Sequence, residues 1–146
     1  MMSLRMVRVL GLVVLCLPFA AQNALATGNL DCAIDDRQLT FEFFALTGSN
    51  GGIVQVNQAS IALKAGDDKA LRGSRPIEQK HIEQQWIYGN ELRLRIAIPD
   101  AKGQPAGSLV LIGSSKFGEE SYAGRYVLSL DQAGGEKVFK GRMKCG

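Results

Sequence analysis

The sequence predicts an all-β fold: about eight antiparallel strands that close into a small up-and-down barrel, after an N-terminal signal-peptide helix. Three observations lead to this prediction. Apolar and polar residues alternate with a period of two over many short segments. Clusters of turn-forming residues separate these segments, and no stretch after residue 26 sustains the 3.6-residue periodicity of an amphipathic helix. A β-sandwich made of the same strands is the alternative architecture.

The first 26 residues have the pattern of a secretory signal peptide. Arg5 and Arg8 form a positively charged start, residues 9–21 are uncharged, and residues 24–26 supply the small-x-small pattern of a cleavage site. The uncharged run has the length of a signal-peptide core and is too short to span a bilayer. We therefore expect this leader to be removed and the protein to reach the periplasm or to be secreted.

Cleavage after residue 26 leaves a single β domain over residues 27–146. Its longest unbroken apolar run, residues 109–112, is far too short for a membrane span, so we expect no stable membrane insertion after cleavage. The full chain has 17 Lys and Arg against 14 Asp and Glu, and two of these cations belong to the leader, which leaves a net charge of only +1. A net charge this small does not favour binding to nucleic acid, and we expect no nucleic-acid partner.

The cysteine count indicates one disulfide bond. Of the three cysteines, Cys16 lies in the leader, so Cys32 and Cys145 are the only pair left in the domain. An exported compartment is oxidising enough to keep such a bridge. Closing a loop of this length stabilises a fold by about 4–5 kcal/mol in the chain-entropy model. We expect the bridge to join the first strand to the last.

The strands follow one another with short connections. The segment 39–46 alternates between apolar and polar residues, and the next strand changes its apolar phase at Asn57 and Gln58, which predicts a bulge. Gly89-Asn90 is a two-residue hairpin loop with glycine first, as a type II′ turn requires. The polar segment 65–79 is predicted to be the longest loop, with room for one helical turn. The remaining strands are predicted over residues 53–63, 81–88, 91–98, 109–114, 122–130 and 137–145.

The residue types that common catalytic and metal sites need are scarce. His81 is the only histidine of the chain, and with both remaining cysteines in a bridge, no material is left for a zinc site. Pairs of acids occur at 35–36, 67–68 and 119–120, all in predicted turns, where solvation explains them better than catalysis. We expect no enzyme activity, no cofactor and no metal. Two carboxylates at a suitable separation can hydrolyse a glycosidic bond, so an acid-residue hydrolase is kept as an alternative.

Two features suggest recognition. Lys140, Arg142 and Lys144 form a cationic row on the last strand, which suits an acidic partner or phosphate groups. The alternative interpretation is a charged strand face that keeps the sheet soluble and prevents edge pairing.

The second feature is aromatic. Tyr122 and Tyr126, with Arg125 between them, and Trp86 and Tyr88 are candidates to line a cavity or a binding rim. The alternative is that this row belongs to the core, because a barrel of about eight strands is only just wide enough for its own side chains or one small ligand.

The segment 121–126 (SYAGRY) resembles, in part, the serine-glycine-x-x-tyrosine signature of bacterial periplasmic inhibitors of c-type lysozyme, which are small disulfide-linked β-barrels. The match departs from that family at its centre, because Ala123 and not a serine precedes Gly124, and because Tyr126 follows one residue too soon. The inhibitory loop of that family is therefore not transferred to this chain.

Three functions remain open. The first is a non-catalytic periplasmic or secreted module that binds a small ligand, a polymer or another envelope protein. The second is an inhibitor of an envelope or extracellular hydrolase such as lysozyme, with the segment 119–126 as the inserted loop. The third is the acid-residue hydrolase. The identity of any ligand, the oligomeric state and the physiological role are not encoded in these patterns.

Overall fold

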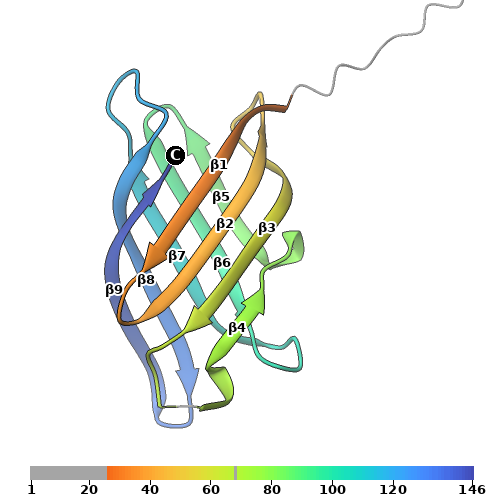
Figure 1. Ribbon diagram of the computed structural model, residues 1–146, viewed down its shortest axis with the longest axis vertical. Coiled ribbons are helices and arrows are strands. Elements are labelled where there is room, and N and C mark those ends of the chain that lie inside the picture. Colours follow the sequence, from red (N-terminus) through yellow and green to blue (C-terminus); the bar gives the residue numbers. More distant parts are fainter. Residues whose placement is uncertain (1–25, 68) are drawn as a thin grey trace, which may run out of the picture.

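The computed structural model describes residues 26–67 and 69–146, which form a β structure with two short 3-10 helices (Figure 1). The predicted leader lies outside this range, except for Ala26. Within the described part, no helix has the length and apolar character that crossing a membrane requires. The elements are β1 (Ala26–Asp35), β2 (Leu39–Gly48), β3 (Ile53–Leu63), η1 (Lys69–Leu71), β4 (Gly73–Pro76), η2 (Gln79–His81), β5 (Ile82–Tyr88), β6 (Glu91–Pro99), β7 (Pro105–Ser114), β8 (Tyr122–Gln132) and β9 (Gly135–Cys145).

All nine of these strands belong to one antiparallel sheet, in the order β4-β3-β2-β1-β9-β8-β7-β6-β5. Every neighbouring pair is consecutive in the chain except β1 and β9, which lie side by side and bring the first and last strands together (Figure 1). This order makes β4 and β5 the two edges of the sheet, and the sheet curls on itself. The predicted all-β, barrel-like class is confirmed, and the architecture is one curled sheet, not two packed sheets.

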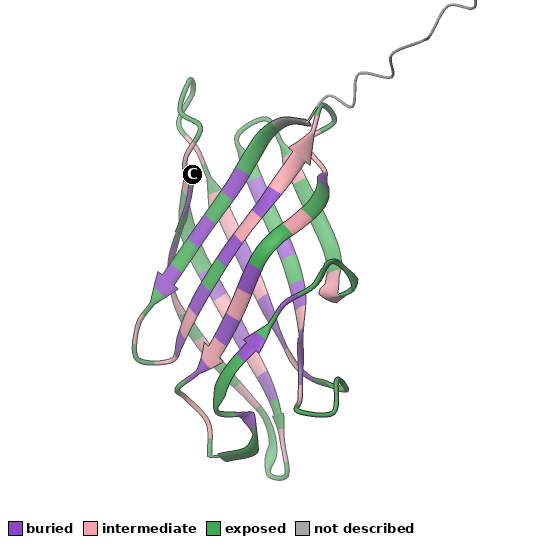
Figure 2. Cartoon of the chain, turned by 45° about the vertical axis from the view of Figure 1, so that its right-hand side comes forward, coloured by how far each residue is buried: buried purple, intermediate pink, exposed green. Residues whose placement is uncertain are grey.

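Alternation along the strands separates a filled interior from a polar exterior. Figure 2 shows buried and exposed residues succeeding one another along most of the strands. On β6, for example, Leu92, Leu94 and Ile96 are almost inaccessible, whereas Arg93 and Arg95 between them are exposed. The interior is occupied by leucine, isoleucine and phenylalanine side chains that form one continuous core. The candidate binding surfaces are therefore on the outside of the curled sheet.

Two local predictions from the sequence are confirmed. Gly89 has a φ of +56° and joins the paired residues Tyr88 and Glu91, as expected for the glycine-first hairpin loop. In the β2–β3 pair the register shifts between Phe44 and Ala45, so Asn57 has no partner and forms a bulge.

The predicted loop over residues 65–79 contains more structure than the sequence indicated. It holds η1 and also β4, which pairs with β3 at residues 60–62. β4 and β5 run in the same direction along the sheet edges and are separated by the turn around η2. The ninth strand thus arises because one stretch of chain pairs first with β3 and then with β6. The sequence of β4 is short and polar, and it has no alternation of apolar and polar residues that could have revealed the pairing with β3.

No backbone ladder joins β3 to β5 across the gap in the curled sheet. Glutamine side chains from η2 and β5 form hydrogen bonds to the backbone of β3 there. The side-chain oxygen of Gln85 accepts a hydrogen bond from the Ile53 N–H at 2.6 Å, and its amide lies 3.5 Å from the Ile53 carbonyl oxygen. Gln79 accepts a bond from the Val56 N–H at 3.1 Å. These side chains replace the strand-to-strand bonds that would otherwise close the barrel.

Replacing Gln85 by leucine should therefore loosen this seam. We expect the free energy of unfolding to fall by about 1 kcal/mol, because the Ile53 backbone groups lose their partner. Gln84→Leu is the matched control, since the exposed side chain of this neighbour forms no hydrogen bond within the described part of the chain, and the change should alter stability little. Urea unfolding of both variants measures the difference, and equal effects would contradict the bridging role.

Candidate functional site

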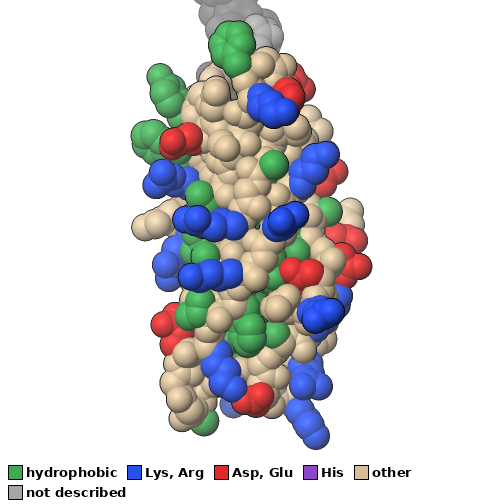
Figure 3. Space-filling model, turned by 90° about the vertical axis from the view of Figure 1, so that its left-hand side faces the viewer, with side chains coloured by type: hydrophobic (Ala, Val, Ile, Leu, Met, Phe, Trp, Pro, Cys, Tyr) green, Lys and Arg blue, Asp and Glu red, His purple; other side chains and the backbone are tan. Residues whose placement is uncertain are grey.

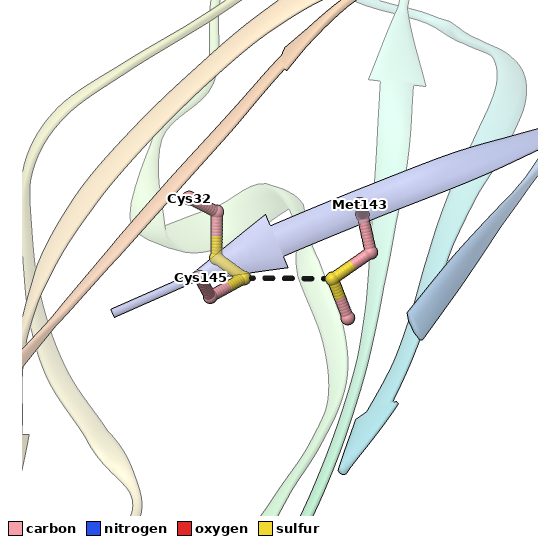
Figure 4. Close-up of a disulfide and its surroundings, with 3 residues drawn as sticks. All are labelled: Cys32, Met143 and Cys145. Atoms are coloured by element: carbon pink, nitrogen blue, oxygen red, sulfur yellow. Dashed lines mark hydrogen bonds between the residues drawn. A yellow bond between two sulfur atoms is a disulfide. The ribbon is translucent and has the colours of Figure 1, made fainter. Parts of the chain in front are cut away.

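The predicted disulfide bond joins the two ends of the domain. Cys32 on β1 and Cys145 on β9 are directly opposite one another, with an S–S distance of 2.04 Å and a Cα–Cα distance of 4.0 Å (Figure 4). Both residues are buried, and the Met143 sulfur lies 3.8 Å from the Cys145 sulfur. The bridge closes the β1–β9 pair, in which the register gives only two residue pairs. Its role is structural.

The side chain of Tyr126 lies inside the curled sheet, and that of Tyr122 packs against the core. Tyr126 is fully buried, and its hydroxyl donates a hydrogen bond to Asp36 Oδ2 at 2.5 Å. Its ring lies over Gly141, where an added Cβ would come within 2.4 Å of a ring carbon. Tyr122 is half-buried opposite Cys145. Tyr126 is thus inaccessible to a ligand, because the core encloses it.

The contact between Tyr126 and Asp36 also shifts the pKa of both groups. Partial burial raises the pKa of this carboxyl, but hydrogen bonds from the Tyr126 hydroxyl and from the backbone N–H groups of Gln38 and Leu39 outweigh burial, so the pKa is lowered overall. Burial, followed by the bond to Asp36 and by its negative charge, raises the pKa of Tyr126 well above its usual range. The pair is a partly buried structural contact.

The other predicted site residues lie together on the outer face of β8 and β9. Arg125 stands directly opposite Arg142, and Lys140 and Lys144 flank Arg142 on the same side of β9. All four side chains are exposed. Within residues 26–67 and 69–146, none of the four forms an ion pair, although five other ion pairs occur there. We call these four residues the cationic face.

The sheet register extends this face across its neighbours. Arg142 pairs with Arg125, Arg125 with Ile112 on β7, Ile112 with Arg93 on β6, and Arg93 with Trp86 on β5. These residues form a single row across the outer surface of five strands. In Figure 3, Lys and Arg side chains gather over the face presented to the viewer, with hydrophobic side chains between them.

A shallow groove of about 640 Å³ lies at the β5 end of this row. Trp86, which is 56% exposed, lines it together with Arg93 and Arg95. Val110 and Ile112 are its outward-facing apolar residues on β7. The sequence singled out Trp86, but the cross-strand register that brings Trp86 and Arg93 into one row with Arg125 could not be read from it.

Several of the acidic residues, and the histidine, have structural partners. Asp35 forms an ion pair with Lys64 at 2.5 Å, and Asp67 forms one with Lys137. The His81 ring nitrogen Nδ1 accepts a hydrogen bond from the Glu78 backbone N–H at 2.9 Å. Over the described ranges, no three His, Cys, Asp or Glu side chains are placed to hold a metal ion.

The fold and the surface define a class of small β proteins: a disulfide-closed curled sheet with a filled interior and an arginine- and lysine-rich outer face. Comparisons with protein-family models, with curated proteins and with solved structures found no match for this chain. Its functional assignment therefore depends on the chemistry of the surface itself.

Proposed function

We propose that this protein is an exported, non-catalytic binding module whose cationic face recognises anionic groups on a ligand or envelope partner. The observation that carries the proposal is the direct opposition of Arg125 and Arg142 without a carboxylate partner in the described part of the chain. Like charges directly opposite on a sheet destabilise it. The surface therefore has unbalanced positive charge that an anion would neutralise.

The geometry of the face suits a multivalent anion. Side chains on neighbouring strands are about 5 Å apart, and those two residues apart on one strand are about 7 Å apart. One carboxylate or phosphate can accept charge-assisted hydrogen bonds from both guanidinium groups of Arg125 and Arg142. Lys140 and Lys144 extend the positive charge along β9 on either side. A ligand with several anionic groups can thus contact the face at more than one point.

Reversing the charge of the arginine pair tests this proposal. We expect Arg125→Glu/Arg142→Glu to weaken binding to dextran sulfate at low salt by at least about tenfold, because the opposed cations become opposed anions. The matched control, Lys69→Glu/Lys102→Glu, changes the net charge equally at exposed positions outside this face and should retain most of the binding.

A second variant separates binding from stability. Arg125→Ala/Arg142→Ala removes the repulsion, so it should keep or raise the free energy of unfolding while it weakens binding. Binding that is equal in the wild type and in both arginine variants, or that depends only on net charge, would refute the cationic face as the site.

The inhibitor alternative has one observation in its favour. Phe117 is 97% exposed in the β7–β8 connection, next to the segment 119–126 that the sequence suggested as an inserted loop. A turn closed by the Glu119 N–H and the Lys116 carbonyl, with Gly118 at a φ of +83°, holds it outward. A protruding aromatic side chain suits insertion into a partner's cleft. Slowing of c-type lysozyme by the wild type but not by Phe117→Ala would support this alternative.

A further inference from the structure

We propose that the ligand is an acidic polysaccharide whose sugar ring stacks on Trp86 in the groove while its anionic groups contact Arg93, Arg125 and Arg142. This inference rests on the proposed binding function and specifies the ligand of the same surface. It is based on what the groove contains besides positive charge.

An aromatic ring and an apolar floor are arranged for a flat, partly apolar partner. Trp86 is only half covered, and its ring meets that of Tyr88 in an edge-on arrangement, at 6.1 Å between centroids. A face of an aromatic ring is slightly negative and attracts polarised C–H groups such as those on the faces of a sugar ring. Val110 and Ile112 continue this apolar surface beside Arg93 and Arg95.

The polar lining of the groove is mixed, which distinguishes a sugar from a plain polyanion. The amide of Gln84 both donates and accepts hydrogen bonds, the carboxylate of Glu91 accepts them, and Arg93 donates them. Hydroxyl groups need this combination of donors and acceptors. The hydroxyl groups of a sugar can donate hydrogen bonds to the Glu91 carboxylate, whereas ionised phosphate groups only accept them. Arg93 and Glu91 form an ion pair in which the guanidinium nitrogen and the carboxylate oxygen are 3.6 Å apart. Because this distance exceeds that of a hydrogen bond, the N–H groups of Arg93 are available to a ligand.

The groove continues toward the cationic face. A second hollow of about 350 Å³ shares Glu91, Arg93 and Ile112 with the first and ends at Arg125. The outward-facing pair Ser114 and Ala123 has small side chains, which leaves this hollow open. From β5 to β9 the path crosses four strand spacings, about 19 Å in all. This length suits an oligomer and exceeds a single sugar.

The sole tryptophan of the chain provides a direct test. Because Trp86 lines the groove, titration with an oligogalacturonate should change its fluorescence and saturate, whereas inorganic polyphosphate should bind with a much smaller change. Trp86→Ala should weaken oligogalacturonate binding about tenfold by calorimetry and leave polyphosphate binding within about twofold. Trp86→Phe should restore part of the loss. The exposure of Trp86 makes these variants compatible with folding.

The outcomes separate this inference from the proposed function. If polyphosphate binds through Arg125 and Arg142 but oligogalacturonate neither perturbs Trp86 nor depends on it, the polysaccharide assignment is wrong and the cationic face stands. If neither polymer binds, both proposals fail. If a single-stranded oligonucleotide of equal charge binds more tightly than oligogalacturonate and depends equally on Trp86, the ligand class is overturned.

Discussion

Replacing both Cys32 and Cys145 by alanine is expected to lower the free energy of unfolding by about 4–5 kcal/mol. The two cysteines are 113 residues apart in sequence, so the bridge restricts nearly the whole unfolded domain. In the folded protein it also links β1 to β9 at a strand pair whose register contains only two residue pairs. Loss of the bridge therefore affects both the unfolded chain and the strand pair with the fewest paired residues.

Urea unfolding of the protein, followed by far-UV circular dichroism, measures this effect. Reduction of the wild type should give a loss similar to that of the double-alanine variant, and the variant should not respond to reductant. A variant as stable as the oxidised wild type would show that β1 and β9 remain joined without the covalent link.

Replacing Tyr126 by alanine is expected to cost about 4 kcal/mol, since a large, fully buried side chain is removed from the core. The cavity would lie beside Gly141, which has no side chain to fill it. Tyr126→Phe keeps the ring and removes only the hydroxyl bond to Asp36, so it should cost about 1–2 kcal/mol. Equal losses in the two variants would contradict the packing role of the ring.

Tyr126 also gives stability a dependence on alkaline pH. Burial and the bond to Asp36 raise the pKa of Tyr126 in the folded state, so its contribution is complete below the unfolded pKa of about 10 and declines as the pH rises above it. Unfolding measured at pH 8 and pH 10.5 should show a decline in the wild type that Tyr126→Phe reduces. An unchanged decline in this variant would assign the effect to other groups.

Asp36 makes the stability of the fold depend on acidic pH. Burial raises its pKa, but the hydrogen bonds from Tyr126 and the backbone prevail and lower it, so the contribution of this carboxylate is present above its unfolded pKa and is lost as the pH falls through the folded value. The loss on acidification should be smaller in Tyr126→Phe, because one of the bonds that lower the pKa is absent there.

Much of the fold could be predicted because it depends on residues that are close together in the sequence. The period-two alternation specified which side of each strand is buried, as the leucines and arginines of β6 show. A glycine-first dipeptide specified the β5–β6 turn, and a phase change in β3 specified its bulge. The disulfide pair followed from elimination once Cys16 was assigned to the predicted leader. Each inference needed only neighbouring residues or a count.

The candidate site could be predicted only in part. Lys140, Arg142 and Lys144 share one face because they alternate along one strand, and the sequence alone determines this. The position of Arg125 opposite Arg142, and of Arg93 and Trp86 in the same row, depends on the register of four strand pairs. A shift of one residue in any pair would move a side chain to the other face of the sheet.

The sequence by itself determined the strand character of the chain, the inward and outward faces of its strands and the pairing of its cysteines, because side-chain period and residue counts are properties of the chain alone. Only the tertiary structure decided that β4 pairs with β3, that Tyr126 is buried against Asp36 and that the cations form one row. Those outcomes depend on how the sheet curls and on contacts between residues as much as 90 positions apart, and no local pattern encodes such distances.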